Sequence, residues 1–144
     1  MSAFKFSLQP VLNHRADIEE EKKTEYRQAK QSLQEETKKT QQLIQQINAI
    51  DEQLTRKGMV NVNQLYQLIH YRNQLKQELM NQQKIQAESE QKVEVAQKFL
   101  LQAKLDVQVL EKLKEKNYTQ YVHQENLEEL KLLDELSCIN YGRA

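Results

Sequence analysis

The chain is nearly free of residues that stop a helix. Between Pro10 and Gly142, the only glycine or proline is Gly58. Proline destabilises a helix interior by about 3 kcal/mol and glycine by about 1 kcal/mol. The Gln, Lys, Glu, Leu and Ala residues that fill this sequence lose little side-chain freedom in a helix. The sequence therefore predicts two long helices with one interruption.

The apolar content is too low for a thick globular core. Charged residues make up 29% of the chain, hydrophobic residues 38%, and the mean hydropathy is −0.87. Such a composition is compatible with disorder, but it also suffices for the thin apolar seam of a coiled coil. Because the apolar residues keep a helical register, we expect an all-α fold, a long antiparallel two-helix coiled coil (a helical hairpin).

Apolar residues recur in steps of three and four along both predicted helices. The first seam consists of Leu8, Leu12, Arg15, Glu19, Lys22, Tyr26, Ala29, Leu33, Glu36, Thr40, Leu43, Ile47, Ile50 and Leu54. The second consists of Leu65, Leu68, Arg72, Leu75, Leu79, Gln82, Gln86, Ser89, Val93, Ala96, Leu100, Ala103, Val107 and Leu110. Equal rise in two antiparallel helices predicts the pairs Leu54–Leu65, Ile50–Leu68, Leu43–Leu75, Glu36–Gln82, Leu12–Val107 and Leu8–Leu110.

The predicted helix bounds follow from these seams. We expect a first helix at about 8–57, a turn at about 58–61 and a second helix at about 62–139, in a single domain of residues 1–144. A connection this short predicts that the two helices lie antiparallel.

Local signals mark the ends of these helices. Ser7 is a candidate cap for the first helix, with Pro10 tolerated in its first turn. Gly58 follows two cations and stands where a left-handed residue commonly ends a helix. Asn61, with Gln64 three residues later, is compatible with a capping box at the start of the second helix.

The second helix is expected to overhang the first. If the first helix begins opposite Leu110, roughly 25 to 30 residues of the second remain, about 40 Å of helix. Unpartnered apolar residues there predict a binding surface, with self-association as the alternative. These residues are Leu113, Tyr121, Val122, Leu127, Leu130, Leu133 and Leu136. The acidic residues beside them suit a basic-rimmed, apolar-lined channel. They are Glu125, Glu128, Glu129, Asp134 and Glu135.

Charge and apolar runs exclude several classes of partner. Lys plus Arg and Asp plus Glu both number 21, whereas a non-specific nucleic-acid binder needs a basic excess, so no nucleic-acid partner is expected. The apolar runs are too short to span a bilayer, so no direct membrane insertion is expected. The first residues lack the apolar core of a signal peptide. The single Cys138 cannot form an internal disulfide, which favours a reducing, cytoplasmic setting.

The sequence contains no pattern typical of an enzyme. His14, His70 and His123 are scattered and have no metal-ligand spacing. Two glycines are too few for a phosphate-binding loop, and two helices do not enclose a pocket. We therefore expect no catalytic, cofactor or metal site, and no enzymatic activity.

Both ends of the chain resemble the flagellar export protein family FliJ. At the start, the resemblance rests on Phe4-x-Phe6-x-Leu8-Gln9-x-Val11-Leu12-x-x-Arg15, followed by Glu19 and Glu20. At the end, Glu125 and the run Glu129-Leu130-Lys131-Leu132-Leu133-Asp134-Glu135 are similar to an acidic pattern that closes with Lys-x-x-Asp-Glu. Length, scarcity of Gly and Pro, and two-helix architecture agree over the whole chain.

This resemblance implies a non-enzymatic stalk, like the central subunit of rotary ATPases, in the flagellar type III protein export apparatus. The implied location is cytoplasmic, peripheral at the inner face of the cell membrane. The implied partners are the hexameric export ATPase FliI, the cytoplasmic domain of the export gate protein FlhA, and export chaperones. Members insert into the ATPase ring, promote its assembly and activity, and link it to the gate.

The resemblance also implies which residues make these contacts. The candidates for the ATPase ring are Phe6, Leu8, Val11, Leu12, Arg15, Leu130, Lys131, Leu133, Asp134 and Glu135. An aromatic residue four positions before a leucine makes Tyr71 and Leu75 the candidates for the export gate. Because Leu75 also lies on the second seam, ordinary packing is an equal interpretation of that residue.

Other functions are compatible with the same architecture. An equivalent stalk of a virulence injectisome shares it, and the gene neighbourhood would separate the two. A generic coiled-coil tether or a prefoldin-like chaperone arm is a different class, and it predicts that no ATPase responds to the protein. A helical arm that binds tRNA is disfavoured by the neutral charge balance.

Overall fold

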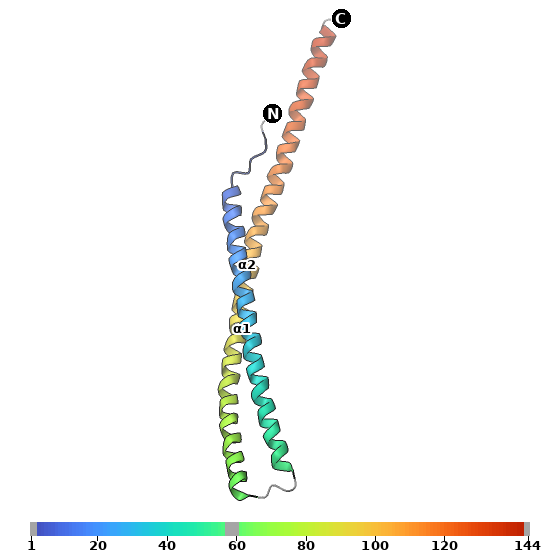
Figure 1. The fold of residues 1–144 in the computed structure, drawn as a ribbon. Coiled ribbons are helices and arrows are strands. Elements are labelled where there is room, and N and C mark those ends of the chain that lie inside the picture. Colours follow the sequence, from blue (N-terminus) through green and yellow to red (C-terminus); the bar gives the residue numbers. More distant parts are fainter. Residues whose placement is uncertain (1–2, 57–60, 143–144) are drawn as a thin grey trace. The chain divides into compact units, whose positions relative to one another are not determined.

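The computed structural model describes residues 3–56 and 61–142, which contain two helices. Helix α1 spans Gln9–Thr55 and helix α2 spans Val62–Gly142. No strand occurs in the described residues. The contacts between the helices confirm the expected all-α antiparallel hairpin (Figure 1).

The helix ends partly follow the predicted caps. The carbonyl of Leu8 accepts the backbone N–H of Leu12 at 2.9 Å, so Leu8, and not Ser7, occupies the cap position of α1. Asn61 caps α2, because its Oδ1 accepts the backbone N–H of Asn63 at 3.1 Å. The expected C-terminal signal at Gly58 lies outside the described residues.

Contacts divide the chain into two compact units, Met1–Glu20 with Leu101–Ala144, and Glu21–Leu100. Each unit contains one stretch of α1 packed on one stretch of α2. The expectation of a single domain over the whole chain stays a prediction.

In the unit formed by the two chain ends, the core is aromatic and aliphatic. Phe6, Leu12 and Val107 are buried together, with Phe4 and Leu110 packed against them. The cluster confirms the predicted pair of Leu12 and Val107.

The seam position predicted for Leu8 is wrong. Leu8 is 37% exposed, whereas Phe6 is only 7% exposed. The seam spacing holds only within a helix, and the chain before Gln9 is not helical. A non-helical segment places its side chains with a different period, so Phe6 takes the position next to α2.

The segment before α1 runs on along α2. The ring of Phe4 lies 5.4 Å from that of Tyr118, edge to face, and 5.5 Å from that of Tyr121. Tyr121, which was expected to be unpartnered, is therefore in contact with the N-terminal segment.

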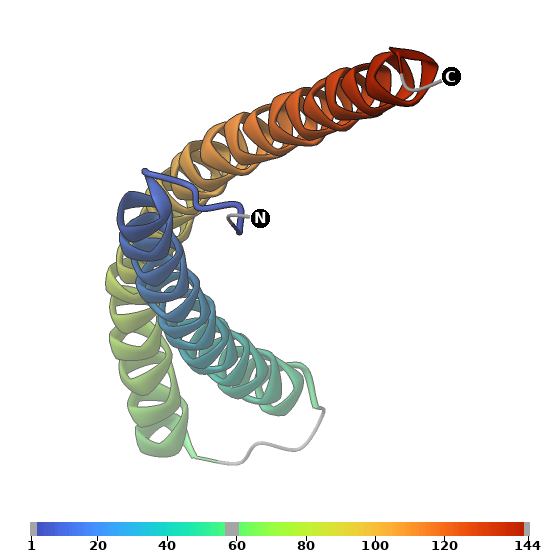
Figure 2. The same cartoon turned by 90° about the horizontal axis from the view of Figure 1, so that it is seen from above.

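The overhang of α2 is accordingly shorter than expected. It consists of residues 122–142, about 30 Å of helix, and we call it the C-terminal overhang. All its residues are exposed except Glu125, which is half-buried. Its red end stands clear of the N-terminal segment in Figures 1 and 2.

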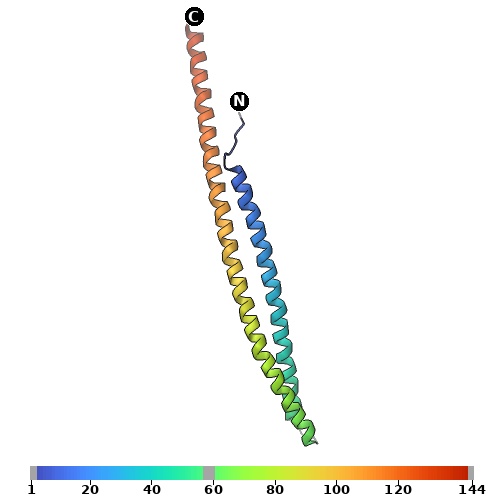
Figure 3. The same cartoon turned by 90° about the vertical axis from the view of Figure 1, so that its left-hand side faces the viewer.

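The unit Glu21–Leu100 contains a second core. Ile47, Ile50 and Leu75 are buried, and Leu75 is the most buried at 4% exposure. The partly buried neighbours are Leu43, Leu54, Leu68 and Leu79. This cluster agrees with the predicted register where the green stretch of α2 lies beside α1 (Figure 3). Leu65, which was predicted to lie opposite Leu54, is 38% exposed.

Candidate functional site

The C-terminal overhang exposes leucines in steps of three. Leu127, Leu130 and Leu133 are 45%, 57% and 61% exposed. At about 100° per residue, this spacing places them along one side of α2. We call these three residues the leucine ridge.

Charged side chains surround the leucine ridge. Lys131 lies between Leu130 and Leu133 in the helix, and Asp134 and Glu135 follow Leu133 directly; all three are exposed. An apolar ridge with charges beside it is the arrangement by which a helix docks into a groove on another protein. Chemically, the overhang is suited to binding a protein surface.

The N-terminal candidates divide into buried and exposed residues. Phe6 and Leu12 are buried against Val107, so their side chains pack the hairpin. Leu8 and Val11 are 37% and 42% exposed and are open to a partner.

Arg15 has a partner within the chain. Its Nη1 lies 3.6 Å from Oδ2 of Asp106, and the two side chains are 46% and 36% exposed. This ion pair joins α1 to α2 at the protein surface, where such pairs contribute little to stability.

The structure does not bring the N-terminal and C-terminal candidates together. Among the described residues of the N-terminal segment, Phe4 contacts α2 as far as Tyr121, whereas Leu130 lies nine residues further along the same helix. Nine helical residues span about 14 Å. The assignment of all ten residues to a ring contact stays a prediction.

The two gate candidates also differ in burial. Leu75 lies in the core with Ile47 and Ile50, so its side chain packs the hairpin. Tyr71 is 48% exposed and is available for contact.

Sequence reasoning missed an exposed apolar stripe near the start of α2. Val62, Tyr66 and Ile69 are 77%, 77% and 43% exposed. Their spacing of four and three places them on one side of the helix. The same spacing is present in the sequence, but these residues alternate with Leu65 and Leu68 of the second seam, so spacing alone does not show which set faces α1.

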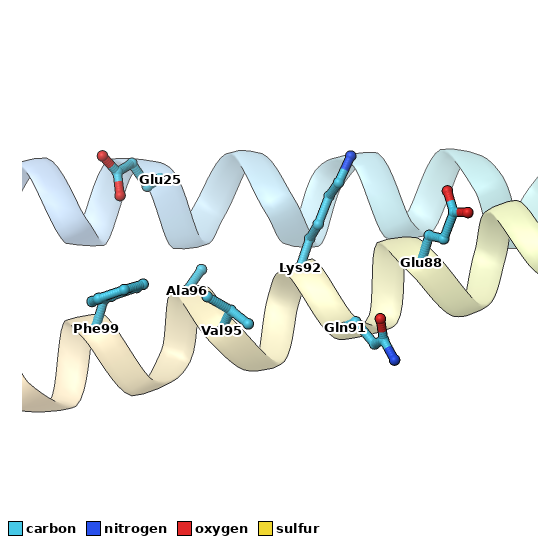
Figure 4. Close-up of a pocket in the computed structure, with 7 residues that line it drawn as sticks. All are labelled: Glu25, Glu88, Gln91, Lys92, Val95, Ala96 and Phe99. Atoms are coloured by element: carbon cyan, nitrogen blue, oxygen red, sulfur yellow. The ribbon is translucent and has the colours of Figure 1, made fainter.

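A shallow groove of about 490 Å³ lies in the unit Glu21–Leu100 and was also missed. Its lining residues are Glu25, Glu88, Gln91, Lys92, Val95, Ala96 and Phe99. Glu25 comes from α1 and the others from α2, with the side chain of Lys92 extending toward α1 (Figure 4). Lys22 lies over the Phe99 ring at 5.4 Å and binds Glu25 at 3.2 Å. These contacts make the groove an apolar patch with charged edges.

Over residues 3–56 and 61–142, no three His, Cys, Asp or Glu side chains gather as they do around a metal ion. Neither helix has, in its described residues, the length and hydrophobicity that crossing a bilayer requires.

Comparison with known protein families shows the family of this chain. The sequence model of the family described as flagellar FliJ protein matches residues 4–144. No curated protein and no solved structure matches the chain. The family match covers nearly the whole chain, both ends included.

Proposed function

Because the chain belongs to the FliJ family of non-catalytic components of the flagellar protein export apparatus, we propose that it is the stalk of the export ATPase FliI. In this proposal the helix ends insert into the FliI hexamer and promote its assembly and activity. The stalk also links the ring to the cytoplasmic domain of FlhA and binds export chaperones. It acts in the cytoplasm, peripheral at the inner face of the cell membrane.

The observation that carries the proposal is the exposed leucine ridge on the C-terminal overhang. A stalk has to present a bare helix to the inner surface of a ring, and Leu130 and Leu133 are more than half exposed. The carboxylates of Asp134 and Glu135 follow the ridge and suit a channel with basic residues at its rim.

Differential contact supplies a mechanism. A single stalk meets each interface of a six-fold ring in a different orientation. It therefore binds some nucleotide states of the subunits better than others and shifts their populations. The stalk needs no catalytic group of its own for this effect.

Burial separates direct contacts from positioning residues within the predicted set. Leu8, Val11 and the leucine ridge are exposed and contact the ring directly in this proposal. Phe6 and Leu12 are buried and act by holding the N-terminal segment on α2. For the gate, Tyr71 makes the contact and the buried Leu75 positions it.

The first test is ATP hydrolysis by the cognate FliI, titrated with this protein. We expect saturable stimulation near one chain per six ATPase subunits. The double variant Leu130→Ala with Leu133→Ala should lose most of this stimulation while keeping its helicity. The matched control is Leu101→Ala with Leu105→Ala, because these leucines are also exposed on α2 but lie outside the overhang.

Three outcomes are distinguishable. Stimulation that survives in the ridge variant shows that the ridge is not the ring contact. Equal loss in the control points to a general effect on α2. No stimulation by the unmodified chain contradicts the stalk and favours a coiled-coil tether or an injectisome partner.

The gate contact has its own test. We expect Tyr71→Ala to weaken binding to the cytoplasmic domain of FlhA without changing the thermal unfolding of the hairpin. Tyr66→Ala is the matched control, because it removes another exposed tyrosine of α2. Equal binding by wild type and Tyr71→Ala would remove Tyr71 from the gate contact.

A further inference from the structure

The face of α2 that the start of the chain covers continues into the overhang. Val107, Leu110, Lys114 and Tyr121 are buried or half-buried and mark the covered face. Their steps of three, four and seven correspond to the spacing that keeps residues on one side of a helix.

The same spacing carried onward reaches a second set of apolar residues. Leu132, Leu136 and Ile139 are 60%, 49% and 52% exposed. They lie on the same side of α2 that the start of the chain covers between Val107 and Tyr121. This side is nearly opposite the leucine ridge. We call Leu132, Leu136 and Ile139 the continuing face.

Glutamates flank the continuing face. By the same spacing, Glu125 and Glu128 lie on the same side of α2, between Tyr121 and the continuing face, and Glu129 lies beside them at the edge of that side. A second copy of this chain is a poor occupant, because pairing two such faces would bring glutamates next to glutamates.

The covered part of the same unit indicates what fits this face. There, the apolar residues Leu12 and Val107 pack together across the two helices. Beside them, Arg15 of α1 meets the carboxylate of Asp106 on α2 at 3.6 Å. An apolar ridge with a basic residue beside an acidic one is thus the arrangement that already covers this side of α2.

We propose that the continuing face docks an amphipathic helix of a partner protein whose apolar ridge is flanked by Lys and Arg residues. The docked helix lies on the same side of α2 as the start of α1, but further toward the C-terminal end of α2. Burial of Leu132, Leu136 and Ile139 supplies most of the affinity. The Lys and Arg residues of the docked helix pair with Glu128 and Glu129. These pairs contribute more to the choice of partner than to the affinity. This site goes beyond the stalk function, which uses the leucine ridge. Docking of this helix and insertion into the ring are alternative states of one molecule, because a ring encloses every side of an inserted helix.

The test uses the full chain and a synthetic probe. The probe is a fluorescently labelled helical peptide of about 21 residues, the length of the overhang, with Leu at its a and d positions and Lys and Arg at e and g. A matched peptide carries Glu at e and g. Fluorescence anisotropy should show saturable binding of the basic peptide and at least about tenfold weaker binding of the acidic one.

Two variants locate the site. Leu132→Ala with Leu136→Ala should weaken binding of the basic peptide at least about tenfold. Leu130→Ala with Leu133→Ala, on the leucine ridge, is the matched control and should bind within about twofold of wild type. Circular dichroism checks that both variants keep the helicity of the wild type.

Charge reversal tests the proposed chemistry. Glu128→Lys with Glu129→Lys should reverse the preference, so that the acidic peptide binds better than the basic one. An unchanged preference would overturn the role of the two glutamates.

Other results would overturn the site itself. They are no binding of the basic peptide, equal binding of both peptides to the wild type, or equal loss in the ridge control. Self-association that Leu132→Ala abolishes would make a second copy the occupant. ATPase stimulation is measured separately, and its failure in the ridge variant leaves the peptide result unaffected.

Discussion

Gln82 on α2 donates from one amide nitrogen to two oxygens of Glu36 on α1, the backbone carbonyl at 3.1 Å and Oε2 at 2.6 Å. The pair confirms the predicted register in a stretch where the seam is polar. The hydrogen bond from Gln82 lowers the pKa of the Glu36 carboxyl, burial opposes the shift, and Lys39 at 3.5 Å lowers the pKa further.

The lowered pKa of Glu36 makes hairpin stability depend on pH. The folded chain holds this carboxylate ionised more strongly than the unfolded chain does. Its contribution is therefore complete above the unfolded pKa and is lost as the pH falls through the folded one. We expect Glu36→Gln to melt below the wild type at about pH 7 and the two melting curves to converge at about pH 2. Glu35→Gln, at an exposed neighbour, is the control and should follow the wild type at both pH values.

Removing Leu75 should destabilise the hairpin. This side chain is 4% exposed among Ile47 and Ile50, and a buried Leu→Ala change costs about 2–5 kcal/mol. We expect the lower part of that range, since a two-helix seam relaxes easily. Urea unfolding of Leu75→Ala measures the loss. Leu101→Ala, at 59% exposure, should stay within about 0.5 kcal/mol of the wild type, and a similar loss in both variants would contradict the assigned core.

Removing the Phe4 ring should loosen only the N-terminal segment and its partner on α2. An aromatic pair contributes about 0.5–1.5 kcal/mol beyond its buried area, and Phe4 contacts Tyr118 and Tyr121. We expect Phe4→Ala to speed amide exchange around these tyrosines and to leave the stretch around Leu75 unchanged. Hydrogen exchange followed by mass spectrometry resolves the two regions. Faster exchange at both would show that the effect is not local.

The Arg15–Asp106 pair should contribute little to stability. Both side chains are more than a third exposed, and exposed ion pairs measured by double-mutant cycles give about 0.2–1 kcal/mol. We expect a coupling energy in this range for Arg15→Ala and Asp106→Ala. The same two variants also show whether Arg15 contacts the ATPase ring or only pairs with Asp106. If Arg15 touches the ATPase ring, Arg15→Ala will reduce ATPase stimulation well beyond Asp106→Ala.

The helical part of the fold was predictable because one period governs it. Steps of three and four placed Leu12 opposite Val107 and Leu75 among its neighbours on α1, and the structure confirms both. The same steps failed at Leu8, where the chain is no longer helical and Phe6 is buried in its place.

The contacts of Lys22 show another limit of sequence reasoning. The seam contains this cation where a coiled coil prefers an apolar residue. The structure accommodates it because its ammonium group lies over the Phe99 ring and binds Glu25. Such a contact depends on the direction of side chains across the seam, which spacing alone does not give. For the candidate site, spacing found the leucine ridge and the burial of Leu12, but not the burial of Phe6, which precedes the helix.

The length of the segment before α1 determines how many residues of α2 are left uncovered. Ser7 and Leu8 form a turn, in which the backbone N–H of Gln9 donates to the carbonyl of Phe6 at 3.1 Å, and the residues before it are not helical. An extended chain advances about 3.3 Å per residue and a helix about 1.5 Å, so each extended residue before the turn covers about two residues of α2. Shortening this segment by two residues would uncover about one more helical turn, that of Tyr121. The length of α2 that is exposed for binding a partner thus depends on a few residues that belong to neither helix.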